Sequence, residues 1–362
     1  AIDAGELTGD SDLLSKVLTY HVVQGEITAS DISDGQTVET LQGETLRFSL
    51  SNGGVQVNGA NVTTADLQAS NGVVHVIDGV LLENVTTTER AVLTPQLSTL
   101  TDAVTAAGLA DDLSGSGPFT VFAPLNSAFD AIDAGELTGD SDLLSKVLTY
   151  HVVAGSAIEA GDISDGQTVE TLQGGDLTFS VDGGTVRANG IPVSTADVQT
   201  SNGVVHLIDG VLLDAVTTTE RAVLTPDFST LADLVVRAGL DDDLNGDGPL
   251  TVFAPTNQAF LDALDADDSG SIEEGEIPSQ SQLESILTYH VVSGAAIASS
   301  DISDGQSVQT LEGSDVTFGV GGGTVTINPS DENATVAAPD VQVSNGIIHG
   351  IDTVLTPPSG SN

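Results

Sequence analysis

The sequence contains no cysteine, no methionine and no tryptophan, and only 7 of its 362 residues are lysine or arginine. Without cysteine the chain forms no disulfides and offers no thiolate nucleophile and no cysteine-based zinc or iron–sulfur site. Seven scattered cations are too few to neutralise a nucleic acid backbone or to hold an anionic lipid surface. No apolar run reaches the ~18–20 residues of a membrane-spanning helix. We therefore expect neither nucleic acid binding nor membrane insertion.

Acidic residues dominate the charge: 53 aspartates and glutamates give a formal net charge of −46. They are spread along the chain, and 39% of the residues are hydrophobic, which is enough for packed cores. Such a surface repels itself at low salt and is screened at molar salt, where the Debye length is ~3 Å. The pattern predicts a protein from a salt-rich habitat. A surface protein that meets abundant divalent cations is the alternative.

Long internal repeats organise the chain. Residues 1–23 recur without change at 131–153, and TTTERAVLTP occurs at 86–95 and again at 217–226. A diverged third copy carries LTYHVV and DISDGQSVQTLEG. Because the copies are a whole domain length apart, they are tandem globular domains rather than a solenoid of short units. We predict three units, the first of which has only the back half of the repeat: residues 1–87, 88–217 and 218–358.

The front half of a complete unit begins with helices. Leu97, Leu100 and Val104 share one helix face, and Gly108 ends that helix. A buried apolar strand with the letters TVFAP follows, at 118–125 in the second unit and at 249–256 in the third.

The back half opens with another helix, for which Ser281 and Glu284 predict a capping box in the third unit. Tyr-His-Val-Val and several short strands of alternating polarity follow, and the last of these in the first unit is expected at 72–82. Helices followed by many short strands predict an α+β domain.

Three motifs, in order, resemble the fasciclin domain family: TVFAPxNxAF, LxxxLTYHVV and SNGxxHxIDxVL. The resemblance covers essentially the whole chain and implies tandem domains, each a β-wedge or sandwich of short strands flanked by helices. It also implies a role in extracellular adhesion and in matrix or cell-surface assembly. With the acidic composition, it suggests a surface protein of a halophilic or marine prokaryote.

We therefore expect a non-enzymatic extracellular structural or adhesion protein, in cell-surface, matrix or filament assembly. Its expected partners are further copies of itself, in a head-to-tail polymer, or components of the surface or matrix. The alternative is an extracellular module that binds a ligand or glycan, although 3 tyrosines and 9 phenylalanines leave few aromatic walls for a pocket. The chain has no Gly-x-Ser-x-Gly elbow and no phosphate-binding loop, so no enzyme is expected.

All six histidines occupy two positions of the repeat, in Tyr-His-Val-Val and in Asn-Gly-x-x-His. We expect each imidazole to form hydrogen bonds within its own domain rather than to bind metal or act as a catalyst. In animal members of the family that the chain resembles, the Tyr-His motif is linked to receptor-mediated adhesion. Here the motif falls on three pairs: Tyr20-His21, Tyr150-His151 and Tyr289-His290.

An insertion at 265–276 in the third unit matches the twelve-residue calcium loop D-x-D-x-[DNS]-G-x-I-x-x-x-E. It predicts one Ca²⁺, held by Asp265, Asp267, Ser269, Ser271 through its carbonyl, Glu273 through water, and Glu276. A solvated acidic surface loop is the competing interpretation. A weaker match begins at Asp241, but Val252 stands where the bidentate glutamate belongs, and a turn is expected there instead.

The back half at 1–87 carries apolar residues shaped to pack against a front half. We expect the missing helices and TVFAP strand to come from upstream in a longer array, and a neighbouring chain is the alternative source. Three Asn-x-Thr sequences, at Asn61, Asn84 and Asn333, are acceptors for N-glycosylation where the organism carries it out.

The dense acidic surface leads to a prediction about salt. The melting temperature should rise steeply between low and molar KCl or NaCl, because the ions screen the repulsion. Thermal melts recorded across that range test this, and a melting temperature that does not change would contradict the salt-rich habitat.

Overall fold

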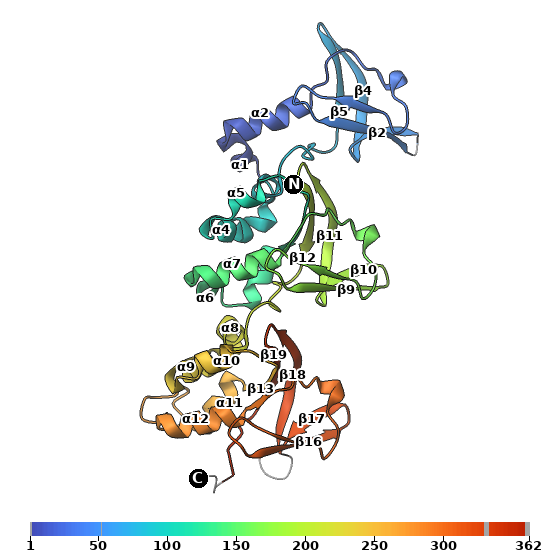
Figure 1. The fold of residues 1–362 in the computed structure, drawn as a ribbon. Helices are drawn as coiled ribbons and strands as arrows, with labels where there is room; N and C mark the ends of the chain where they lie inside the picture. Colours follow the sequence, from blue (N-terminus) through green and yellow to red (C-terminus); the bar gives the residue numbers. More distant parts are fainter. Residues whose placement is uncertain (1, 52, 329–332, 359–362) are drawn as a thin grey trace. The chain divides into compact units, whose positions relative to one another are not determined.

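The computed structural model describes residues 2–51, 53–328 and 333–358, and it holds three separate sheets, one in each repeat (Figure 1). Neighbouring strands follow the order β1-β2-β3-β4-β5 in the first sheet, β7-β6-β12-β11-β10-β9-β8 in the second and β14-β13-β19-β18-β17-β16-β15 in the third. Two compact units divide the chain: Ala1–Asn126, His151–Leu172 and Leu177–Asp209 form one, and Ser127–Tyr150, Gln173–Asp176 and Gly210–Asn362 form the other. Helices and sheets in every repeat confirm the predicted α+β class.

The first repeat contains two helices and a meander of antiparallel strands. Asp3 and Asp10 begin the helices, because each carboxylate accepts hydrogen bonds from two backbone N–H groups of the first turn. The elements are α1 (Ala4–Gly9), α2 (Ser11–Tyr20), η1 (Ala29–Asp31), β1 (Thr37–Glu39), β2 (Thr45–Ser51), β3 (Gly54–Val57), β4 (Ala60–Ala69) and β5 (Gly72–Ile77).

The second repeat adds the front-half elements. The predicted helix with Leu97 and Leu100 is confirmed, and Gly108 follows its end with a φ of 70°. The elements are α3 (Thr87–Val92), η2 (Pro95–Leu97), α4 (Ser98–Ala106), α5 (Ala110–Leu113), β6 (Phe119–Pro124), η3 (Asn126–Ala131), α6 (Ala134–Gly139), α7 (Ser141–Tyr150), β7 (Val152–Ala154), η4 (Ala160–Asp162), β8 (Thr168–Glu170), β9 (Asp176–Asp182), β10 (Thr185–Ala188), β11 (Ile191–Thr200) and β12 (Gly203–Ile208).

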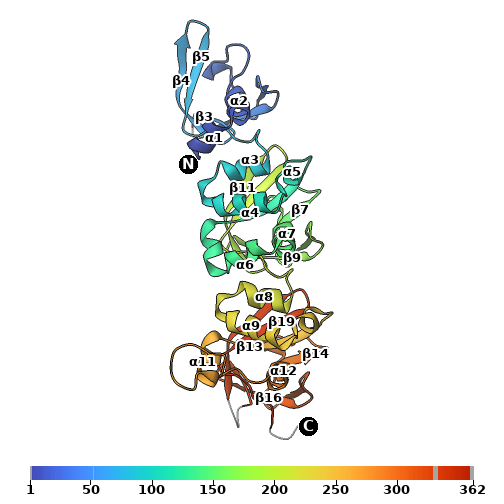
Figure 2. The ribbon, with the colours of Figure 1, turned by 90° about the vertical axis from the view of Figure 1, so that its left-hand side faces the viewer.

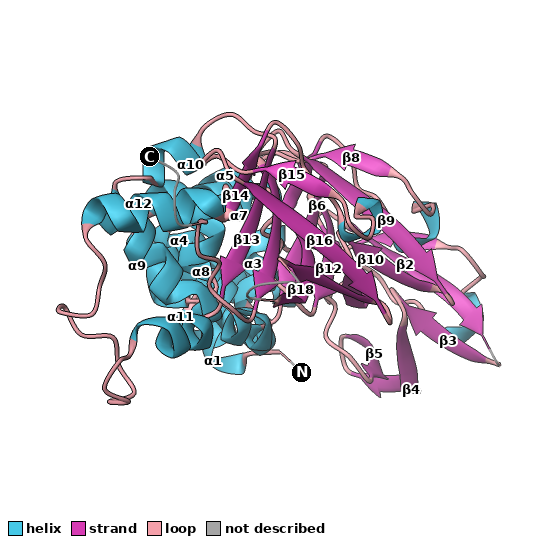
Figure 3. Ribbon diagram, turned by 90° about the horizontal axis from the view of Figure 1, so that it is seen from below, coloured by secondary structure: helices cyan, strands magenta, loops and turns pink. Residues whose placement is uncertain are grey.

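In the third repeat, helices α9, α11 and α12 lie on one side of the strands β13, β16 and β18 (Figure 3). The elements are α8 (Thr218–Leu224), η5 (Pro226–Phe228), α9 (Ser229–Ala238), α10 (Asp241–Asn245), β13 (Leu250–Pro255), α11 (Asn257–Leu264), α12 (Gln280–Tyr289), β14 (Val291–Ser293), η6 (Ser299–Asp301), β15 (Ser307–Gln309), β16 (Asp315–Gly321), β17 (Thr324–Ile327), β18 (Ala334–Val343) and β19 (Gly346–Ile351).

Two predicted details of these elements are wrong. Helix α12 begins two residues earlier than expected, because Ser279, directly after Pro278, forms the capping box with Gln282. The strand expected at 72–82 ends at Ile77, because the Asp78 carboxylate turns the chain by accepting hydrogen bonds from the backbone and side chain of Asn61.

The TVFAP strand is paired along both of its edges in each seven-stranded sheet, as the second strand from one end. Strand β6 runs parallel to β12 on one side and antiparallel to β7 on the other, and β13 lies in the same way between β19 and β14. All six residues of β13 are buried. The neighbouring strands approach so closely that a Cβ on Gly203 would lie 2.1 Å from the Phe119 carbonyl oxygen, and one on Gly346 would lie 2.1 Å from that of Leu250.

The histidines of the third repeat hold loops to the sheet, as predicted. The buried His290 ring contacts the Ile286 carbonyl through Nδ1 at 2.8 Å and accepts the Leu355 N–H through Nε2 at 2.9 Å. One ring nitrogen therefore donates and the other accepts, which is the neutral imidazole. Burial lowers the pKa of His290 to about 4.

This burial makes stability depend on pH. The ordinary pKa of His290 in the unfolded chain lies near 6.5, so between pH 6.5 and 4 the unfolded state binds a proton that the folded state does not. Acidification from above pH 6.5 to below pH 4 should therefore lower the unfolding free energy by about 3 kcal/mol through this group. Urea unfolding at pH 7.5 and pH 5.5 should show lower stability at pH 5.5. A His290→Asn variant should lose less on acidification; an equal loss would contradict the assignment.

Candidate functional site

The acidic insertion at 265–276 joins α11 to α12 in the third repeat. Its apolar residue Ile272 packs against the helical core of that repeat, as does Ile277 directly after the insertion. Arg237 of α9 forms a two-pronged ion pair with Glu274, with N–O distances of 2.6 and 2.8 Å. The insertion is therefore attached to the body of the repeat along its length.

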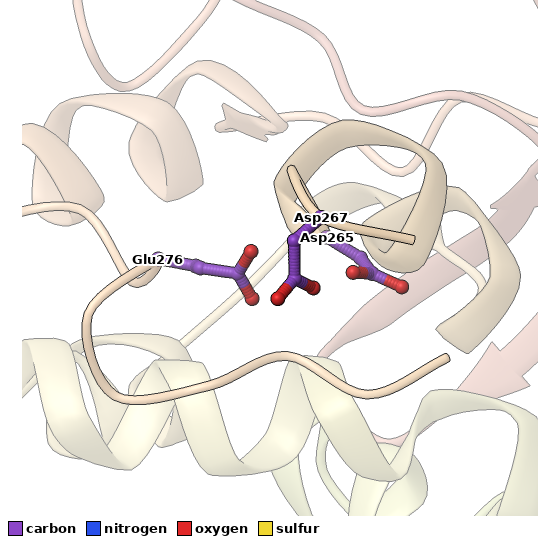
Figure 4. A group of neighbouring side chains, drawn as sticks. All are labelled: Asp265, Asp267 and Glu276. Carbon is purple, nitrogen blue, oxygen red and sulfur yellow. The ribbon is translucent and has the colours of Figure 1, made fainter. Parts of the chain in front are cut away.

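Three carboxylates of the insertion converge. Asp265, Asp267 and Glu276 each place one oxygen within 4.8 Å of the others, and the Glu276 side chain extends toward the two aspartates (Figure 4). Glu276 accepts the Ala266 N–H at 2.7 Å and the Glu273 N–H at 2.9 Å. The last residue of the twelve is thereby bonded to the second and the ninth.

The turn between these carboxylates is set by Asp265 and Gly270. Asp265 accepts the Gly270 N–H at 2.7 Å and the Ser269 N–H at 3.0 Å, and these hydrogen bonds lower the pKa of its carboxyl. Gly270 has a φ of 82°, the left-handed conformation that glycine adopts without strain. The Ser269 hydroxyl donates to the Ser271 carbonyl oxygen at 2.9 Å.

The structure thus brings three of the six predicted ligands together as carboxylates and places Ser269 and Ser271 in the same turn. Glu273 lies outside the carboxylate cluster. The weaker match at Asp241 is not a turn, as had been expected, but the short helix α10. The side chain of Asn245 at its end accepts hydrogen bonds from the hydroxyls of Thr217 and Thr219.

A second feature, the junction between consecutive repeats, was missed from the sequence. Helix α3 is bonded to both repeats it connects, within one compact unit. On one side Glu89 accepts the Lys16 ammonium at 2.7 Å, and the Leu93 carbonyl accepts the Asp3 N–H. On the other side, Thr87 donates its N–H to Asn202 and its hydroxyl to the Leu113 carbonyl.

The same junction recurs at α8, within the other compact unit. Glu220 pairs with Lys146 at 2.6 Å, and the Leu224 carbonyl accepts the Asp133 N–H. Lys16 and Lys146 are the only lysines of the chain. The sequence signal was the unchanged TTTER segment, whose first threonine and glutamate form the capping box of each helix.

An asparagine holds each junction helix to the next sheet, and in the third repeat it is buried. Asn345, directly before β19, accepts the Thr218 N–H at 3.0 Å and donates to the carbonyls of Leu244 and Gly246 at 2.8 and 3.1 Å. This explains the asparagine of the SNGxxH motif.

The tyrosines of the three Tyr-His pairs face inward. Each ring is 2% exposed, and each hydroxyl donates to a backbone carbonyl of the same repeat. The Tyr20 hydroxyl also accepts from Asn58 at 2.8 Å, and burial together with Glu83 raises the pKa of Tyr20 to about 12. Of the three predicted glycosylation acceptors, Asn84 is buried and donates to the Lys16 carbonyl, whereas Asn61 and Asn333 are exposed.

This architecture defines a tandem array of fasciclin domains. The fasciclin domain family model matches residues 2–83, 95–214 and 226–357, and the chain belongs to that family. It is 32% identical over 356 residues to the transforming growth factor-beta-induced protein ig-h3 of Sus scrofa, covering 96% of this chain and 50% of that protein. It is 30% identical over 352 residues to Homo sapiens periostin, covering 95% of this chain and 40% of periostin. Over 121 residues it is 50% identical to Protein sll1483 of Synechocystis, covering 32% of this chain and 66% of that protein.

The chain thus spans about half the length of the first two relatives. Across the residues that the structure describes, every helix is too short or too polar to cross a bilayer.

The buried asparagine leads to a stability prediction. Asn345→Ala should lower the unfolding free energy of the third repeat by about 2–3 kcal/mol, because it leaves buried backbone groups without partners. The equivalent residue of the first repeat, Asn71, is exposed, so Asn71→Ala should change stability by less than about 0.5 kcal/mol. Urea unfolding of both variants tests the pair; equal effects would contradict the role of Asn345.

Proposed function

We propose that this chain is a non-enzymatic structural array that acts in adhesion or matrix assembly outside the cell. The observation that carries the proposal is the junction, which repeats with the same bonds at α3 and α8 and joins each repeat to the next. A protein that bears load or bridges surfaces needs such continuity between its domains. Family membership supports the same role.

The expected partners are further copies of the chain or components of a cell surface or matrix. A net charge of −46 suits a salt-rich exterior, such as that of a halophilic or marine prokaryote, where screening permits acidic surfaces to approach one another. Electron microscopy of native material with a gold-labelled antibody tests the location. Label on surface layers or filaments is expected, and label confined to the cell interior would overturn the proposal.

The junction itself can be tested by proteolysis. The double variant Lys16→Met and Lys146→Met should be cleaved faster at 84–95 and 215–226 by proteinase K, because each junction loses an ion pair worth about 0.2–1 kcal/mol. Arg187→Met is the matched control, since Arg187 bonds to Gly190 on an exposed turn. Cleavage as slow as in the unaltered chain would show that the lysines do not support the junction.

A calcium ion at 265–276 is the second proposal, supported by the convergence of Asp265, Asp267 and Glu276. We infer that one Ca²⁺ binds there at ~2.3–2.6 Å from its oxygen ligands, with Ser269 and the Ser271 carbonyl completing the set and Glu273 acting through water. The ion would stiffen the insertion that Arg237 already anchors.

Isothermal titration of the full chain with CaCl₂ tests this site. Glu276→Gln should abolish binding, because it removes a ligand charge from the cluster. Glu274→Gln is the matched control. Glu274 lies in the same acidic insertion but pairs with Arg237, so this variant should still bind calcium. Binding that survives Glu276→Gln would place the ion elsewhere.

A further inference from the structure

The third repeat contains an apolar cavity between its helices and its sheet. Helices α8 and α9 lie against the face of the sheet that carries β13 and β19 (Figures 1 and 2). The cavity has a volume of about 40 Å³ and is lined from these two helices, from α10 and α12, and from β13 and β14. Its lining extends from the buried Phe253 and His290 to Val236, which is 63% exposed. The cavity therefore connects the core of the repeat with the solvent.

The polar side chains that line the cavity are already bonded within the protein. The Thr218 hydroxyl donates to the Leu244 carbonyl at 2.7 Å, and the Thr219 hydroxyl donates to Asn245. Both ring nitrogens of His290 are bonded to backbone groups, and the ring is neutral at pH 7 because burial lowers its pKa to about 4. None of the residues described in the lining is therefore charged. A ligand meets only apolar surface there, which suits a hydrocarbon and disfavours a polar group.

The size of the cavity limits the shape of the ligand. An apolar cavity of about 150 Å³ binds benzene. At about 40 Å³, this cavity accepts only the end of a narrow chain. The remainder of such a chain would lie at the mouth, over Val223 and Val236, and would remove their apolar surface from water.

A comparison with the second repeat shows which residues distinguish the mouth of this cavity. The lining residues recur unchanged at the equivalent positions of the second repeat, except for two on α9. Ala232 and Val236 of α9 stand where α4 has Thr101 and Thr105. Both threonine hydroxyls donate to backbone carbonyls one turn earlier. The third repeat thus has a smaller side chain at one position of the mouth and lacks a hydroxyl at both.

The exposure of Val236 points to the same place. Among the large apolar side chains that the structure describes, Val236 is the most exposed. A single exposed valine is ordinary on a protein surface. This one, however, borders an apolar cavity, so a ligand that enters the cavity would also cover it.

We propose that the third repeat binds the end of a linear, unbranched alkyl chain in this cavity. The chain inserts between α8 and α9 toward Phe253, and its following carbons cover Val223 and Val236. The ligand to which we commit is a free amphiphile with an uncharged head, because a net charge of −46 repels an anionic head. This binding activity is independent of the structural role proposed above.

Isothermal titration of the 362-residue chain with n-octanol tests the cavity. Saturable binding is expected, with a negative heat-capacity change because apolar surface is buried. The affinity should rise about fourfold with each added carbon from n-butanol to n-hexanol, which is the factor for burying one methylene group. Cyclooctanol has as many carbons as n-octanol but holds them in a ring, so it should not bind measurably.

An exchange of residues between the two repeats gives a matched pair of variants. Ala232→Thr combined with Val236→Thr gives the third repeat the mouth of the second, and it should abolish saturable binding. Thr101→Ala combined with Thr105→Val gives the second repeat the mouth of the third, and it should add a second binding site. Each variant introduces residues that the equivalent helix already carries, so both should fold, and thermal melts check this.

Three contrary results would each overturn the proposal. Binding that survives Ala232→Thr with Val236→Thr would place the ligand elsewhere. Cyclooctanol binding as tight as that of n-octanol would indicate a general apolar surface rather than a narrow cavity. A stoichiometry that does not change in Thr101→Ala with Thr105→Val would show that these two positions do not determine binding.

Sedimentation with phosphatidylcholine vesicles tests the source of the alkyl chain. The protein should stay in the supernatant, because the proposed ligand is a free amphiphile. Sedimentation that is lost in the variant with Ala232→Thr and Val236→Thr would assign the alkyl chain to a membrane lipid and would overturn the free source.

Discussion

The constraint on which this protein depends is the TVFAP strand of each complete sheet, which is paired along both of its edges. A strand paired in this way satisfies its backbone groups without water, so its side chains can be buried on both faces. Strand β13 shows the result, because all six of its residues are buried. The cost is a close approach to the neighbouring strand, which only Gly346 and its equivalent Gly203 permit.

This constraint extends from the sheet to the next repeat. Asn345 directly precedes Gly346, and its side chain bonds to the first turn of α8 and to the end of α10. Helix α8 in turn carries Glu220, which pairs with Lys146 of the preceding repeat. A short Asn-Gly pair therefore connects the close contact between β13 and β19 to the helix that joins the preceding repeat, which explains why both residues stand in a single motif.

The features that the sequence predicted correctly are those that local patterns determine. The TVFAP strands and the helix before Gly108 follow from the hydrophobic periodicity and from the glycine that ends the helix. The fixed spacing at 265–276 anticipated that Asp265, Asp267 and Glu276 lie together, and the calcium ion itself stays a prediction. The errors depend on contacts between distant residues. Strand β5 ends early because Asp78 meets Asn61, and the role of Asn345 becomes visible only when the fold brings it to Thr218. Spacing alone could not reveal either partner.

The scarcity of cations limits what can hold the array together. The two lysines stand at the two junctions, and the equivalent residue of the third repeat is the uncharged Ser285. Both ion pairs are about a quarter to a third exposed, so the salt that relieves the acidic surface also weakens them. At high salt the junction must therefore rest on groups that salt does not screen. Leu93 and Val85 pack with Leu7 there, and the backbone bond from Asp3 to Leu93 closes the contact. The ion pairs then serve mainly to position the junction helix against the preceding repeat, and the burial of apolar side chains stabilises the contact.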